Sequence, residues 1–159
     1  MDDLRQALSD LQKDFLPFAP PLLTILGWSI VAKQAAQREV RKERRTEVDA
    51  CCKMAAEILV KARTYYTKDP SDAESLKLER EIKFELYRLA QRVERLEKAC
   101  PKFEVQGTWS ELQDAATGGD FESATRPVRA HSDSVISNIE HWTHQLIDQL
   151  EAGFALTYP

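Results

Sequence analysis

Two histidines near the C-terminus are the residues whose types and spacing could bind a metal ion. His141 and His144 stand three positions apart in HWTH, so on a helix they share one face, with Asp148 four residues beyond the second. Zinc sites take three or four such ligands, and no cysteine or third histidine has a matching spacing, nor is there an HExxH pattern. We therefore interpret both histidines as solvated or hydrogen-bonded side chains, and we predict no metal and no cofactor.

Nucleophilic chemistry has equally little support. Cys51, Cys52 and Cys100 are an odd set without CxxC spacing, and neighbouring helical residues point about 100° apart, so we expect small, buried, reduced thiols. No Ser/His/Asp motif, carboxylate pair or cofactor fingerprint stands out. We predict that the chain is not an enzyme.

The segment TGGDFES, residues 117–123, could form an anion-binding nest of backbone N–H groups. It lacks both the Lys-Ser/Thr ending of a phosphate-binding loop and a preceding strand. A helix end followed by a new helix start explains it better, with Phe121 as a packing anchor.

Phosphate binding is the chemistry that the basic residues after position 32 favour. Residues 33–68 contain ten Lys/Arg and five Asp/Glu, whereas residues 101–159 contain three Lys/Arg and nine Asp/Glu. Such a stretch is typical of a cytoplasmic collar that contacts anionic lipid. Guanidinium groups also bind phosphate bidentately, which would suit an oligonucleotide or nucleotide ligand. The candidate ligand-binding residues are Arg38, Arg41, Lys42, Arg44 and Arg45.

An uncharged apolar run, residues 15–32, comes directly before these basic residues. As a helix it would be roughly 27 Å long, close to the roughly 30 Å of a hydrocarbon core. Because the positive charges follow it, we expect a transmembrane helix of a bacterial inner membrane, with the N-terminus outside and the remaining chain cytoplasmic. A buried helix of a soluble bundle is the alternative. Small or polar residues for helix contacts or pore lining are Thr24, Gly27, Ser29 and Gln34.

The elements that position these residues are all predicted to be helices. Residues 1–14 belong to an amphipathic segment that could lie on the outer leaflet or on a neighbouring subunit. A long helix then runs from Pro21 to about Thr67, with the packing seam Val48, Cys52, Ala55, Leu59, Ala62 and Tyr66. Extending that spacing backward aligns Arg45, Arg41 and Arg38 with the seam, so in an oligomer these arginines would converge on an anionic ligand.

The rest of residues 33–159 is predicted to form a cytoplasmic helical bundle. A turn at Pro70, with Ser71 and Glu74 as a capping box, begins an antiparallel second helix. Its buried positions are Ile82, Leu86, Leu89, Val93, Leu96 and Cys100. A short helix is expected with Thr108 and Glu111 as its capping box. A last helix is expected with Pro127 near its first turn, Gly153 at its end, and a buried face of Val135, Ile139, Trp142 and Leu146.

This layout, a run at 15–32, a basic collar at 33–45 and a helical remainder, resembles small single-span membrane effectors of bacterial antiphage systems. In plan it is similar to the Hailong system effector, whose family forms an oligomeric channel gated by single-stranded DNA oligomers. The resemblance implies a regulated pore.

The function that we expect from the sequence is therefore a homo-oligomeric membrane effector in antiphage defence. It would be an ion channel in the lipid bilayer, regulated by an anionic nucleic-acid or nucleotide ligand at its cytoplasmic domain, and several copies are needed because one helix encloses no pore. The alternative is a membrane-tethered helical adaptor that binds a protein partner without conducting ions.

Overall fold

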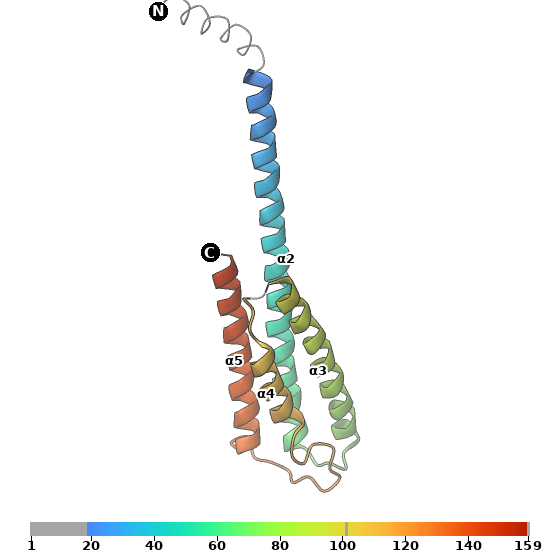
Figure 1. Cartoon of the computed structure of the whole chain (residues 1–159). Helices are drawn as coiled ribbons and strands as arrows, with labels where there is room; N and C mark the ends of the chain where they lie inside the picture. The colour runs from blue at the N-terminus through green and yellow to red at the C-terminus, as the bar shows by residue number, and fades with distance from the viewer. Residues whose placement is uncertain (1–18, 101, 159) are drawn as a thin grey trace, which may run out of the picture. The chain divides into compact units, whose positions relative to one another are not determined.

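A computed structural model of the chain describes residues 19–100 and 102–158, apart from the side chains of residues 19–23, 25 and 26. Every regular element in this part of the chain is an α-helix (Figure 1). The helices are α2 (Ala19–Thr67), α3 (Ala73–Ala99), α4 (Gln106–Thr117) and α5 (Ser134–Thr157). The predicted all-α class is confirmed. The expected segment 1–14 lies outside the described residues.

The predicted transmembrane helix is wrong by the criterion of length and apolarity. Among the described residues, no helix has an apolar stretch long enough to cross a bilayer. The apolar part of α2 runs from Ala19 to Ala32, fourteen residues or about 21 Å, before Lys33 introduces charge. Its prolines, Thr24, Gly27 and Ser29 also lower the mean hydropathy of that part. Residues 15–18 of the expected span lie outside the described residues.

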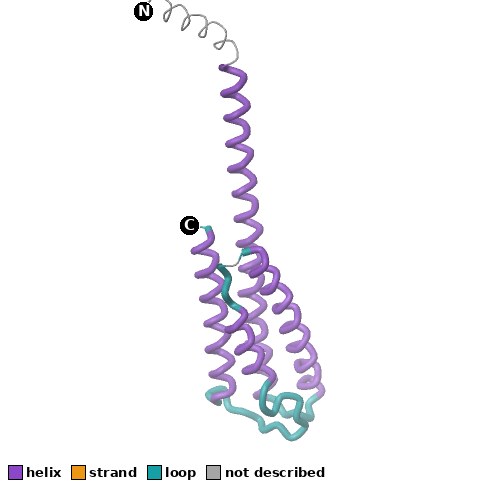
Figure 2. The backbone as a smooth tube through the Cα atoms, in the orientation of Figure 1, coloured by secondary structure: helices purple, strands orange, loops and turns teal. Residues whose placement is uncertain are grey.

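The chain divides into two structural units, Met1–Lys42 and Glu43–Pro159, with the boundary inside α2. In the second unit α3, α4 and α5 pack around the C-terminal half of α2 (Figure 1). The unit has one contiguous apolar core to which all four helices contribute. Figure 2 shows that the loop after α2 and the long loop between α4 and α5 lie at the same end of this bundle.

The packing seam predicted on α2 is confirmed. Five of its six residues are buried, and Cys52 is half-buried. The structure adds Cys51, Ile58 and Tyr65, which are also buried. A stripe of this width is needed because α2 packs against more than one helix. All six predicted positions of the second helix, from Ile82 to Cys100, are buried as well.

The start of α3 lies one residue later than the capping box predicted. Asp72, rather than Ser71, is the N-cap, and its carboxylate accepts a hydrogen bond of 2.9 Å from the Glu74 N–H. Ser71 instead donates from its N–H and hydroxyl to Asp69. Lys61 of α2 pairs with Glu81 of α3 at 2.8 Å, which helps to hold the two helices side by side.

The start of α4 is fixed by a residue of another helix. Val105 is its N-cap and has no capping side chain. Glu97 of α3 supplies the acceptor, because its Oε1 receives hydrogen bonds from the N–H groups of Val105 at 2.9 Å and Gln106 at 2.8 Å. The predicted box of Thr108 and Glu111 is therefore wrong. The Thr108 hydroxyl donates to Gln149 of α5 at 2.6 Å instead.

The last helix differs from the prediction at both ends. It begins at Ser134 with Asp133 as N-cap, so Pro127 lies in the preceding loop. Ile139 and Leu146 are buried as predicted, whereas Val135 and Trp142 are half-buried at the edge of the core. The helix continues through Gly153 to Thr157. Gly153 is there for close packing, since a Cβ would lie 2.8 Å from Cδ1 of the buried Phe103.

Gly153→Ala is expected to lower the free energy of unfolding by about 1 kcal/mol. Alanine gains about 1 kcal/mol of helix propensity over glycine, but overpacking a closed core costs about 1–3 kcal/mol. Gly107→Ala is the matched control, because nothing lies within 4 Å of the Cβ that it would add. That control should be stabilised slightly. Urea denaturation measures both, and a stabilised Gly153→Ala variant would show that Phe103 yields freely.

The three thiols are free, as expected, with Cys51 and Cys100 buried and Cys52 half-buried. Burial raises the pKa of Cys51 from 9.0 to about 12, and the pKa of Cys52 from 9.0 to about 11. The folded chain therefore keeps these thiols protonated at pH values where the unfolded chain loses their protons.

The free energy of unfolding should be independent of these thiols below pH 9 and should fall as the pH rises from 9.0 towards 11 and 12. In that window the unfolded chain binds fewer protons than the folded chain, and the equilibrium shifts towards unfolding. Urea midpoints measured across this range test the effect. A Cys51→Ala/Cys52→Ala variant should lose less stability over the same range, and an equal loss would assign the effect to other groups.

Candidate interaction site on α2

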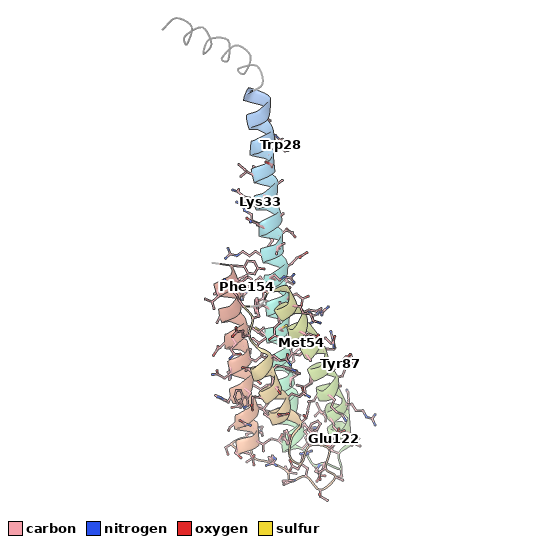
Figure 3. The ribbon with its side chains drawn as sticks, in the orientation of Figure 1. Trp28, Lys33, Met54, Tyr87, Glu122 and Phe154 are labelled. Carbon is pink, nitrogen blue, oxygen red and sulfur yellow. The ribbon has the colours of Figure 1, made fainter. Side chains whose placement is uncertain are left out.

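The first unit carries three exposed, large apolar side chains close together in the sequence of α2. Trp28 is 75% exposed, Val31 63% and Ile30 57%, and Gly27 has no neighbour within 4 Å of its Cβ position. Figure 3 shows Trp28 and Lys33 on this part of α2. Several large apolar side chains exposed to solvent in one place usually mark a binding surface, so this segment is a candidate interaction site.

Three of the four residues predicted for helix contacts lie on one face of this segment. Thr24, Gly27 and Gln34 are all exposed, and together with Val31 they follow the spacing 3, 4, 3 of a helix-packing seam. Ser29 is also exposed but lies off this face. We name Thr24, Gly27, Val31 and Gln34 the open seam. Continuing the same spacing reaches Arg38 and Arg41, which are exposed as well.

Arg45, by contrast, belongs to the second unit and is bound within the bundle. Its Nη1 and Nη2 donate to the two carboxylate oxygens of Glu151 at 2.6 and 2.9 Å, and Nη2 lies 2.9 Å from Oδ1 of Asp49. Its guanidinium also lies over the Phe154 ring, 5.3 Å from the centroid. The hydrogen bonds to Glu151 raise the pKa of Arg45, so it stays charged. Arg45 therefore joins α2 to the end of α5.

The five predicted ligand-binding residues are thus divided between two units. Arg38, Arg41 and Lys42 are exposed residues of the first unit. Arg44 and Arg45 are half-buried residues of the second. A carboxylate already occupies the bidentate edge of Arg45, so an anionic ligand would have to displace Glu151 there.

Among the residues that the structure describes, the histidines do not join other metal-binding side chains. His141 and His144 are exposed on α5, and the His141 ring contacts Trp142 edge to face, with centroids 5.0 Å apart. Within the described ranges, no three His, Cys, Asp or Glu side chains are placed to hold a metal ion.

Sequence reasoning missed two features of the bundle. One is a groove of about 410 Å³ between α3 and α4, lined by Tyr87, Trp109 and Phe121 among others, where Tyr87 is 64% exposed. The other is the pair Arg126 and Arg129 in the loop after α4, which reaches the end of α2. The available signal was the presence of these two arginines in an otherwise acidic C-terminal region.

The comparisons with known proteins identify no relative. No family model, no curated protein and no solved structure matches the chain.

A double-mutant cycle on Arg45→Gln and Glu151→Gln is expected to give a coupling energy between 0.2 and 1 kcal/mol, about the range of exposed ion pairs. Both side chains are 42% exposed, so water screens the pair, and added salt should reduce the coupling. Urea denaturation provides the free energies. The matched control pairs Arg38→Gln with Glu151→Gln, whose effects should add. A zero coupling for Arg45 would show that the pair does not hold α5.

Proposed function

We propose that this chain is a non-enzymatic helical interaction protein that pairs with a second copy of itself through the open seam of α2. The observation that carries the proposal is the exposure of Val31 and Gly27 on a helix face with packing-seam spacing. The ion channel expected from the sequence required residues 15–32 to cross a bilayer, so it is not part of the proposal.

The open seam is self-complementary when two copies run antiparallel. Placing Gly27 of one copy opposite Val31 of the other fills the space over a glycine with a branched side chain. The same register places Thr24 opposite Gln34, so the two polar seam residues face each other. Residues related by a two-fold axis contact each other reciprocally, which is the arrangement that an isologous dimer requires.

Electrostatics also favours the antiparallel pair. In a parallel pair, Arg38 and Arg41 of one copy would lie beside the same residues of the other, and like charges repel. In the antiparallel pair the arginines of the two copies lie at opposite ends of the contact. A ring of arginines around an oligonucleotide or nucleotide would require parallel copies. Binding of such a ligand therefore remains a separate prediction, which the antiparallel dimer does not include.

The bundle of the second unit would then be available to a protein partner, as in the adaptor alternative. Phe84 and Tyr87 support this role, because they are 60% and 64% exposed on α3 and stand one helical turn apart. Each dimer would carry two such surfaces. The proposed protein thus connects two copies of one partner.

Val31→Glu is expected to convert a dimer, twice the chain mass of 18.2 kDa, into a monomer. The reason is that the open seam would bury a charge against its partner. Light scattering coupled to size exclusion measures the mass, and circular dichroism checks that the helices remain. Val60→Glu is the matched control, since Val60 of α2 is 61% exposed but lies away from the open seam. A monomeric unmodified chain, or a dimeric Val31→Glu variant, would contradict the proposal.

The direction of the pair can be tested in the same assay. A Thr24→Cys/Gln34→Cys variant should form intermolecular disulfides readily, whereas Thr24→Cys alone should not. Rapid crosslinking of the single variant would show parallel copies and would favour the arginine ring instead.

A further inference from the structure

Arg126 is a buried cation in the loop between α4 and α5. It is 2% exposed, and its guanidinium lies over the Tyr65 ring, 4.1 Å from the centroid. Arg129 in the same loop pairs with Asp120 at 2.8 Å and with Asp133 at 3.2 Å. Two backbone carbonyls are the hydrogen-bond acceptors of the Arg126 side chain within the described part of the chain. A buried charge without a carboxylate partner is costly, which calls for an explanation.

The hydrogen bonds of Arg126 leave one edge of the guanidinium open. Nη1 donates to the carbonyl oxygens of Tyr66 at 3.3 Å and Lys68 at 3.2 Å, which satisfies that nitrogen. Nε and Nη2 are buried and have no acceptor among the described residues. These two nitrogens form the edge with which arginine binds a carboxylate or phosphate through two parallel hydrogen bonds.

Arg126 also lines a cavity that can hold a small group. The cavity has a volume of about 90 Å³, several times the roughly 10–15 Å³ that one water needs. Its other walls include Tyr65, Leu76, Glu79 and Glu122. The Ser75 hydroxyl, also at the wall, already donates to the carbonyl oxygen of Asp69 at 2.7 Å. Arg126 contributes two donors, Nε–H and Nη2–H, that have no acceptor among the described residues.

The charges around the cavity disfavour a doubly charged anion. Glu79 and Glu122 line it, and Lys83 pairs with both of them. Hydrogen bonds from Ser71 lower the pKa of the Asp69 carboxyl, and the Arg126 guanidinium is near enough to add to that shift. Three carboxylates against two cations repel a doubly charged phosphate more strongly than a singly charged carboxylate. A carboxylate brings one charge and the two oxygens that the open edge requires.

We propose that this cavity binds a carboxylate group, with Nε–H and Nη2–H of Arg126 each donating to one of its oxygens. The site is independent of the dimer proposed above. Because both nitrogens are enclosed, part of the cavity wall has to move outward to admit the ligand. Glu122 in that wall has a φ of 69°, a left-handed value that costs energy for a residue with a Cβ. The carboxylate can come from a free organic acid or from the C-terminus of a peptide.

Titration of the full chain with sodium acetate, followed by the arginine Nε–H signals in NMR spectra, tests the site. The Arg126 signal should shift and saturate, whereas the Arg129 signal should stay in place, because Asp120 and Asp133 already neutralise that guanidinium through Nη2 and Nη1. Acetamide should leave both unchanged, because it lacks the charge. No shift with acetate, or an equal shift with acetamide, would overturn the proposal. So would a stronger response to inorganic phosphate than to acetate.

Two further experiments identify the source of the carboxylate and the role of the two parallel donors of Arg126. A short peptide with a free C-terminus should compete with acetate if the source is a peptide, and its C-terminally amidated form should not. If the free-acid peptide fails to compete, the source is a small organic acid. Arg126→Lys should bind acetate about tenfold more weakly, since lysine keeps the charge but lacks the two parallel donors. Arg88→Lys, at an exposed position of α3, is the matched control and should bind normally. Undiminished binding by Arg126→Lys would overturn the assignment, and the unmodified chain gives a decisive result even if that variant does not fold.

Discussion

The apolar stripe of α2 between Val48 and Tyr66 is the surface on which the bundle depends. Its residues form the shared part of a core to which α3, α4 and α5 each add a stripe of their own. A helix gains most of its stability in a protein from burying such a stripe, and much less from its own propensity. The loss of any one of the three neighbours would therefore expose part of the same stripe.

Tyr66 shows how closely the end of that stripe is used. Its hydroxyl donates to the carbonyl oxygen of Ala116 at the end of α4, at 3.1 Å. Its own carbonyl oxygen accepts from the backbone N–H of Arg129 at 2.9 Å and from the Arg126 side chain. Carbonyl groups in the last turn of a helix have no partner within the helix, so these contacts supply what the helix lacks. The end of α2 therefore anchors both α4 and the loop that follows it.

The sequence was sufficient to predict the features that repeat. The seams of α2 and α3 follow the spacing 4, 3 without interruption, and the structure buries them as expected. The caps were harder, because Glu97 begins α4 from a different helix and no local pattern contains that contact. The cavity at Arg126 could not be predicted from the sequence for the same reason, because its walls come from residues 65–79 and 122–126.

The expected membrane span failed for a different physical reason. A run without formal charge is not apolar throughout, because threonine, serine, glycine and proline contribute little to transfer into hydrocarbon. The basic residues that follow the run belong to two different structural units. Arg45 donates two hydrogen bonds to the carboxylate of Glu151, whereas Arg38 lies in the other unit and is exposed. Two arginines that look alike in the sequence can thus differ in role, one joining two helices and the other being exposed to solvent.

The anchoring of the long α4–α5 loop to the end of α2 bears on how the bundle opens. A loop of this length would ordinarily fray by itself and offer an early cleavage point to proteases. Here its two arginines are fastened to the backbone of Tyr66 and Lys68, so releasing the loop also frees the last turn of α2. Local fluctuation of the loop and fraying of that helix end thus become one cooperative event, and amide hydrogens in both segments should exchange at a common rate.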